Sequence, residues 1–174
     1  MKRIEVRLSL EIVAPLLDVI KSVADALHEK LAAPLDIGEV DADMREFWRD
    51  ELIGAQNVDI AKLMALFDKE FFANGVVGFD ADNAEPVVRA CAALRLRLRE
   101  ENLKSLPDEL LETSEVEVEE LPQPVRKYFM GYLFLATLQE LIIQHLDTLG
   151  EGDDDDDVED EDGEDSEADE NEKN

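Results

Sequence analysis

The segment formed by residues 150–174 cannot contribute to a packed core. It holds 16 acidic residues and a single base, so its net charge is −15. Only two of its side chains are apolar, Val158 and Ala168. Fixing a residue costs roughly 1–2 kcal/mol of conformational entropy, and repulsion between like charges also opposes compaction. We therefore predict a disordered acidic tail over residues 150–174 and one folded domain over residues 1–149.

The preceding part of the chain has the composition of a globular domain, but it is acidic as well. A domain of about 150 residues buries roughly two-thirds of the surface of its unfolded chain. This part carries 29 acidic and 16 basic residues, so it holds −13 of the total charge of −28. Nucleic acids are bound by neutralising their phosphates with Lys and Arg, and binding to an anionic membrane surface likewise needs basic side chains. We therefore expect no nucleic acid and no membrane as partner, but another protein, for which a basic surface is the natural complement.

The single cysteine, Cys91, rules out an intramolecular disulfide and is typical of a reducing compartment. Residues 1–3 are charged, but no apolar segment or cleavage pattern follows them. No run approaches the roughly 18–20 uncharged residues of a membrane span. We expect a cytoplasmic protein.

The N-terminal part of the chain changes from a period of two to a helical period. Apolar side chains alternate with Arg, Glu and Ser over residues 3–10, which predicts a short strand. Over residues 12–31 the apolar positions recur every three or four residues, which predicts a helix with one buried face. Ser9 is the expected N-cap of this helix, and Pro34 follows its end.

Two further helices are predicted before the next strand. The second spans residues 42–53 and ends at Gly54. The third spans residues 60–73, with Asp59 as its N-cap. The dipeptide Asn74-Gly75 stops the third helix, because glycine readily adopts the left-handed conformation that follows a helix.

The middle of the chain predicts a second short strand, residues 76–79, and a fourth helix. Asn83 is the expected cap of this helix, and Pro86 fits its first turn. Its apolar positions repeat at helical spacing and mark a buried face. They are Val87, Cys91, Leu94 and Leu98.

The rest of the domain predicts one helical turn over residues 107–111 and a long last helix over residues 125–149. Between them, the segment 115–119 alternates Val with Glu, so we expect an exposed edge strand whose acids pair with Arg3 and Arg7. The last helix is apolar over much of its circumference and should be central. The fold class is therefore mostly α, a single helical bundle-like domain with two or three short β-strands and a disordered acidic C-terminal tail.

Four features follow one another in a particular order along the domain. They are the alternating segment 3–10 that runs into a Leu-rich helix, the tripeptide Phe47-Trp48-Arg49, the Leu and Arg run 90–99, and the late helix ending in Leu138-Gln139-Glu140. In this order the chain resembles a bacterial helical domain family of unknown function that is best known from actinobacteria. The resemblance covers most of residues 1–149 and implies no catalytic residue. Genes of the relatives often lie near that of a protease adaptor, which implies a link to protein quality control.

No set of residues forms a catalytic or metal-binding motif. Metal sites need several His, Cys or carboxylate ligands that converge, and His28 and His145 have no such partners at helical spacing. Cys91 falls on the apolar face of its helix, where a small core residue is expected instead of a nucleophile. The segment 74–78 has two glycines but lacks the lysine of a phosphate loop, so it predicts a turn. We expect no cofactor, no metal and no catalytic residue.

One basic cluster stands out in this acidic chain. Two interpretations are open. The cluster is either a solvated helix face with Glu85, Glu100 and Glu101 as local partners, or a dock for the protein's own tail or for an acidic partner. Its members are Arg89, Arg95, Arg97, Arg99 and Lys104.

Two pairs of adjacent aromatic residues are the other candidates for a site, namely Phe47 with Trp48 and Phe71 with Phe72. Neighbours in a helix point toward different sides, so all four side chains cannot easily face inward. Core packing against the last helix and a partner-binding patch are both open.

The sequence therefore favours a non-enzymatic protein-interaction module or regulator, linked to protein quality control through the family resemblance. One alternative is an enzyme whose site is built from scattered acids and arginines. A pocket with converging Arg and carboxylate groups would favour it. The other alternative is an acidic competitor for nucleic-acid-binding proteins. Binding to a basic partner that persists in high salt would favour that alternative.

Overall fold

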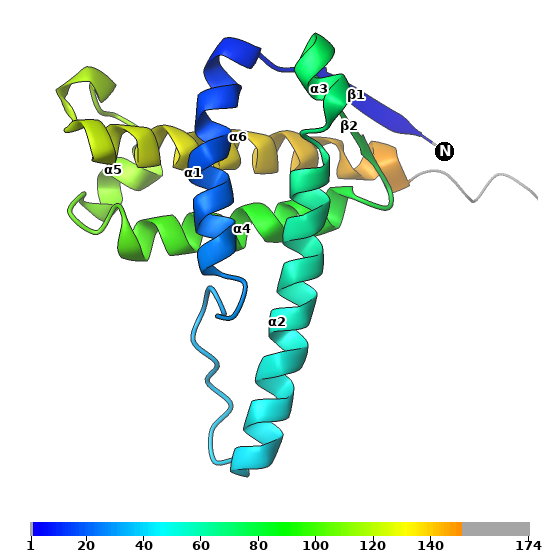
Figure 1. The fold of residues 1–174 in the computed structure, drawn as a ribbon, viewed down its shortest axis with the longest axis vertical. Helices are drawn as coiled ribbons and strands as arrows, with labels where there is room; N and C mark the ends of the chain where they lie inside the picture. The colour runs from blue at the N-terminus through cyan, green and yellow to red at the C-terminus, as the bar shows by residue number, and fades with distance from the viewer. Residues whose placement is uncertain (1, 151–174) are drawn as a thin grey trace, which may run out of the picture.

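The computed structural model describes residues 2–150 and confirms a mostly helical fold with a short two-stranded sheet (Figure 1). The predicted disorder of the tail falls on residues 151–174, which lie outside the described part. The elements follow in the order β1 (Arg3–Arg7), α1 (Leu10–Ala26), α2 (Ala42–Ala65), α3 (Lys69–Asn74), β2 (Val76–Asp80), α4 (Ala84–Glu101), α5 (Asp108–Thr113), the short 3₁₀ helix η1 (Val118–Glu120) and α6 (Gln123–Gly150).

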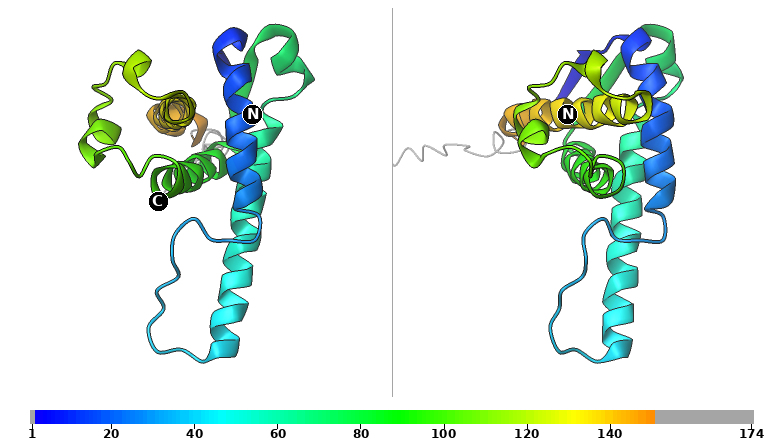
Figure 2. Two further views of the ribbon diagram at one scale, coloured as in Figure 1. Left: turned by 60° about the vertical axis from the view of Figure 1, so that its left-hand side comes forward. Right: turned by 90° about the vertical axis from the view of Figure 1, so that its left-hand side faces the viewer.

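The core lies between two layers of helices. One layer is formed by α1 and α2, and the second by α4 and α6, which run side by side in opposite directions (Figures 1 and 2). With 28 residues at about 1.5 Å each, α6 spans about 42 Å and crosses the whole domain. It contributes Phe129, Leu135 and Leu138 to the centre of the core, where each is fully buried or nearly so. The prediction that the last helix is central is confirmed.

The apolar face predicted for the fourth helix is confirmed on α4. Its four residues are completely buried, because α4 packs against α2 on one side and α6 on the other. Asn83 and Pro86 stand at the start of this helix, as expected. The buried residues of the face are Val87, Cys91, Leu94 and Leu98.

Strands β1 and β2 pair in antiparallel fashion, with Ile4 opposite Phe79 and Val6 opposite Val77. Val77 and Phe79 turn into the core. The first strand ends at Arg7, earlier than predicted. The amide of Leu8 still bonds to the carbonyl of Gly75, but the amide of Gly75 bonds to Phe71 at the end of α3, so the ladder does not continue.

The expected edge strand over the segment 115–119 is wrong. In the described residues the sheet consists of β1 and β2 alone, and this segment instead ends in η1. Ser114 adopts a left-handed conformation (φ 57°) that reverses the chain, and the amide of Val116 bonds to its carbonyl. The backbone groups that a strand would offer to β1 are therefore used in local turns.

The predicted break at Gly54 and the predicted helix 60–73 are also wrong, because α2 runs without interruption from Ala42 to Ala65. Glycine weakens an exposed helix by about 1 kcal/mol relative to alanine, and burial of Ile60 and Leu63 outweighs that cost. Asp59 forms an ion pair with α4 and caps nothing.

The helix that Asp59 was expected to cap starts further along the chain. The true cap is Asp68, whose carboxylate accepts hydrogen bonds from the amides of Glu70 and Phe71 at the start of α3. The predicted stop is confirmed, since Gly75 ends α3 with φ 74°.

Helix α1 ends at Ala26 and not at Leu31, although Ser9 is its N-cap residue as predicted. Two side chains of α2 bind the carbonyls that the early end leaves free. Nε2 of Gln56 donates to the carbonyls of Leu27 and Lys30, at 3.1 and 2.8 Å, and Nδ2 of Asn57 donates to that of His28. These bonds fix the start of the α1–α2 loop against the middle of α2. Among the described residues, no helix is long and apolar enough to cross a membrane.

Candidate functional site

The N-terminal half of α2 projects from the bundle as an arm. We define the arm as residues 42–53; together with the loop that precedes it, it extends beyond the packed layers (Figures 1 and 2). Asp41 caps the arm by accepting a bond from the amide of Asp43, and Nη2 of Arg45 donates to the carbonyl of Gly38 at 3.0 Å. Capping and the loop contact therefore hold the arm in place, while its side chains over residues 42–52 stay exposed.

One face of the arm is apolar. Eight large apolar side chains are exposed in the described part of the chain, and four of them follow one another on this face. Their spacing of three, one and four residues places them along a single side of a helix. We call these four the apolar stripe. They are Met44, 45% exposed, Phe47, 58%, Trp48, 38%, and Leu52, 45%.

The stripe continues into a groove with a cavity of about 500 Å³, which lies between the α1–α2 loop, α2 and α4. Leu52 belongs to both features, so the stripe and the groove form one continuous surface. Small side chains line much of the groove, and we call it the alanine groove. Its lining includes Ala32, Ala33, Ala55, Ala90, Ala92 and Ala93, with Leu31, Pro34, Leu35, Leu52 and Leu96 among the larger residues.

Asp59 is the last residue of α2 that lines the alanine groove, and Arg89 is the first residue of α4 that does so. The guanidinium donates twice to the carboxylate, from Nε at 2.8 Å and from Nη2 at 2.9 Å, and Glu85 approaches it at 3.7 Å. The hydrogen bond to Asp59 raises the pKa of Arg89 above its ordinary value. The one arginine that lines the groove is therefore neutralised from within the chain.

The surroundings of the stripe are strongly acidic. Residues 36–51 contain seven acids and two bases, Arg45 and Arg49, which gives a net charge of −5. The acids are Asp36, Glu39, Asp41, Asp43, Glu46, Asp50 and Glu51. An apolar surface with an acidic border is the result.

The predicted basic cluster is spread over separate sides of α4. Arg89 pairs with α2, as described above. Arg95 contacts α6: it donates to Gln139 at 2.8 Å and to the hydroxyl of Tyr132 at 3.1 Å, and its guanidinium lies 4.6 Å from the centre of the Tyr132 ring. These bonds tie α4 to α6.

The remaining members of the cluster have other surroundings. Arg97 pairs with Glu101 at 3.3 Å. Arg99 pairs with Asp108 at 2.6 Å, and this hydrogen bond raises the pKa of Arg99. Lys104 is exposed beyond the end of α4. The structure therefore does not bring the five basic residues together on one face.

The two aromatic pairs lie on different helices, the first on α2 and the second on α3. Phe47 and Trp48 belong to the stripe on the arm, whereas Phe71 is fully buried and Phe72 is 55% exposed on α3. The four residues therefore do not form one patch. Sequence reasoning missed Met44 and Leu52 as companions of the first pair, although their helical spacing was a usable signal.

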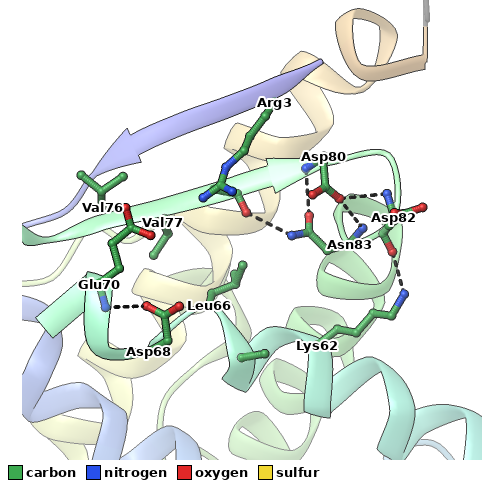
Figure 3. Close-up of a pocket in the computed structure, with 12 residues that line it drawn as sticks. Arg3, Lys62, Leu66, Asp68, Glu70, Val76, Val77, Asp80, Asp82 and Asn83 are labelled. Atoms are coloured by element: carbon green, nitrogen blue, oxygen red, sulfur yellow. Dashed lines mark hydrogen bonds between the residues drawn. The ribbon is translucent and has the colours of Figure 1, made fainter. Parts of the chain in front are cut away.

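A polar pocket of about 300 Å³ lies between α2, α3 and β2 (Figure 3). Arg3 and Lys62 enter it together with several carboxylates. The carboxylates serve the local turns: Asp68 caps α3, and Asp80 accepts hydrogen bonds from the amides of Asp82 and Asn83. Lys62 donates to the carbonyl of Asp82 at 2.7 Å. These groups close turns and do not converge on a common point as an acid, a base and a nucleophile would.

The cysteine and the two histidines are the other side chains with potential reactivity, and their surroundings are those of structural or surface residues. Cys91 is completely buried, and burial raises the pKa of its thiol to about 12. Nδ1 of His145 lies 2.9 Å from the carbonyl of Leu141 one turn earlier in α6, and His28 is exposed. Within residues 2–150, no three His, Cys, Asp or Glu side chains gather as metal ligands would.

Comparison with family models, with curated proteins and with solved structures finds no significant match to this chain.

Proposed function

We propose that this protein is a non-enzymatic interaction module that binds another protein through the apolar stripe and the alanine groove. The observation that carries the proposal is the arm itself: four large apolar side chains follow one face of a projecting helix that no other element of the described chain covers. Scattered exposed apolar residues are ordinary on protein surfaces, but a continuous patch marks an interaction site.

The identities of the exposed side chains support the same function. Trp and large aromatic residues dominate the energetics of protein interfaces when they enter a pocket on the partner. Burial of apolar surface contributes about 25 cal/mol per Å², and one aromatic side chain can bury about 150–250 Å². Phe47 and Trp48 together therefore offer several kcal/mol of binding free energy before the cost of association is subtracted.

The cellular role that we propose for such a module is that of an adaptor or regulator in protein quality control, in the cytoplasm. Support for this role comes from the family resemblance and from the gene neighbourhood that it implies. An adaptor requires an exposed surface that can bind another protein, and the apolar stripe and the alanine groove offer such a surface.

A capture experiment with matched variants tests the proposed function. The bait is the full-length protein, and the variant Phe47→Ala/Trp48→Ala removes the centre of the stripe. Phe72→Ala is the control, because Phe72 lies on α3, away from the arm, and is nearly as exposed as Phe47. We expect the wild type and the control to retain a protein that the double variant loses. Identical sets of proteins on all three baits would contradict the proposal.

A further inference from the structure

We propose that the ligand of this surface is a basic amphipathic α-helix of another protein, which lays its apolar side along the stripe and the alanine groove. This inference rests on the proposed function and specifies the chemistry of the partner. Three features of the surface support it: its shape, its length and its charge.

The shape of the surface suits a helix. An amphipathic helix binds by placing side chains spaced three and four residues apart into an apolar groove. Ala55, Ala92 and Ala93 have short side chains, so the axis of a bound helix can approach α2 and α4 closely. The larger Trp48 and Leu52 stand beside this shallow part and can pack against the flank of the same helix.

The length of the surface suits about three turns of helix. Met44 and Ala55 are eleven positions apart on α2, which corresponds to about 16 Å along its axis. A partner helix that follows this track meets the stripe first and the groove afterwards. The ion pair between Arg89 and Asp59 then marks the end of the track.

The charge of the surface decides between the candidate ligands. The border of the stripe carries −5 over residues 36–51, and the whole chain carries −28. A second copy would bring the same negative charge to the interface, and an anionic membrane would be repelled as well. Lysine and arginine on the flanks of a partner helix would instead neutralise the border and speed the encounter. The cations near the surface do not reverse this preference: Arg45 and Arg49 are already counted in the net charge of −5, and Arg89 is paired with Asp59.

A direct test is available because Trp48 is the only tryptophan of the chain. Its fluorescence reports on the stripe in the full-length protein. The probe is a capped amphipathic peptide of about 18 residues, with leucine at helical spacing on one side, lysine on the other and no aromatic residue. The matched peptide carries glutamate in place of every lysine. We expect the lysine peptide to shift the Trp48 emission to shorter wavelength in a saturable titration, and the glutamate peptide to leave it unchanged.

Two variants locate the binding. Ala92→Gln places a larger uncharged side chain in the groove, and we expect it to weaken binding of the lysine peptide at least tenfold. Ile12→Gln is the control, because Ile12 is an exposed apolar residue on α1, outside the groove. It should leave the affinity within twofold of that of the wild type.

Each contrary outcome has a definite meaning. Equal binding of the two peptides, no response to either, or full affinity of Ala92→Gln would overturn the basic-helix inference. A dimer of the protein alone that the Phe47→Ala/Trp48→Ala variant dissociates would overturn it too, since a second copy would then occupy the surface. The capture experiment is independent of these results: a partner lost by that double variant would uphold the proposed function even if the peptide failed to bind.

Discussion

Arg89 and Asp59 join the N-terminal part of α4 to the C-terminal part of α2 by two parallel hydrogen bonds of 2.8 and 2.9 Å. Thirty residues separate them in the chain. The pair holds the two helices at the place where they border the alanine groove. It also leaves the side chain of Asp59 only 13% exposed, whereas that of Arg89 is 57% exposed.

Replacing Arg89 by alanine should destabilise the domain by about 1 kcal/mol, at the upper end of the range for exposed ion pairs, because Asp59 loses two charge-assisted bonds. The free energy of unfolding in urea measures the effect. Lys21→Ala is the matched control: its pair with Asp25 is a single contact between two exposed side chains within α1, which is worth a few tenths of a kcal/mol. An equal decrease in the free energy of unfolding for the two variants would show that the Arg89 pair does not stabilise the packing of α2 against α4.

Replacing Gly54 by alanine should stabilise the protein by about 0.5–1 kcal/mol, because this glycine lies inside a helix and a Cβ there would meet nothing within 4 Å. Thermal unfolding measures the change. Gly75→Ala is the opposite case, since Gly75 has φ 74° and its Cβ would lie 2.5 Å from the carbonyl oxygen of Leu8. We expect that variant to be destabilised by more than about 1 kcal/mol. A destabilising Gly54→Ala would show that α2 is interrupted there.

The thiol of Cys91 should be inert in the folded protein. Its pKa of about 12 keeps it protonated at pH 8, and complete burial blocks access. A disulfide reagent should therefore label it slowly in buffer and rapidly in denaturant. Fast labelling in buffer would mean that the core around α4 opens readily.

The same pKa implies a dependence of stability on pH. The unfolded thiol ionises near pH 8.5 and the folded one near pH 12, so the unfolded state loses its proton first. This contribution to stability is complete below about pH 8.5 and is lost as the pH rises toward 12. The free energy of unfolding should therefore decrease more between pH 7 and pH 10 in the wild type than in Cys91→Ala. An equal decrease in the two proteins would contradict the raised pKa of Cys91.

Removal of residues 151–174 should leave the unfolding temperature within about 2 °C of that of the full chain, which corresponds to less than about 1 kcal/mol at this size. The reason is composition, since those residues offer two small apolar side chains and a large excess of acid. Calorimetry of the full-length and shortened proteins measures the two unfolding temperatures. A drop of about 10 °C would show that the segment stabilises the domain.

The elements predicted correctly from the sequence are those in which a local signal and burial agree. The face formed by Cys91 and its neighbours on α4 is an example, and the glycine stop at Gly75 is another, because only glycine tolerates that conformation easily. The errors arose where packing overrides a local signal. Gly54 lies within a continuous helix because Ile60 and Leu63 are buried further along it, and Asp59 serves an ion pair in place of a cap.

The candidate site was harder to predict than the fold. Phe47 and Trp48 were visible in the sequence as residues without an obvious place in the core. The groove was not visible, because it depends on contacts between distant segments. Gln56 binds the end of α1, and Asp59 binds α4, and neither bond leaves a pattern in a single sequence.

Site-specific photo-crosslinking at the stripe tests the central claim most directly. Phe47 is replaced by the photoreactive analogue benzoylphenylalanine in the full-length protein, and in a second protein Phe72 is replaced in the same way. After illumination in cells, the account predicts a crosslink from position 47 to one defined protein, with no such product from position 72. Crosslinks from position 72 alone, or the same products from both positions, would show that the arm is not the docking surface.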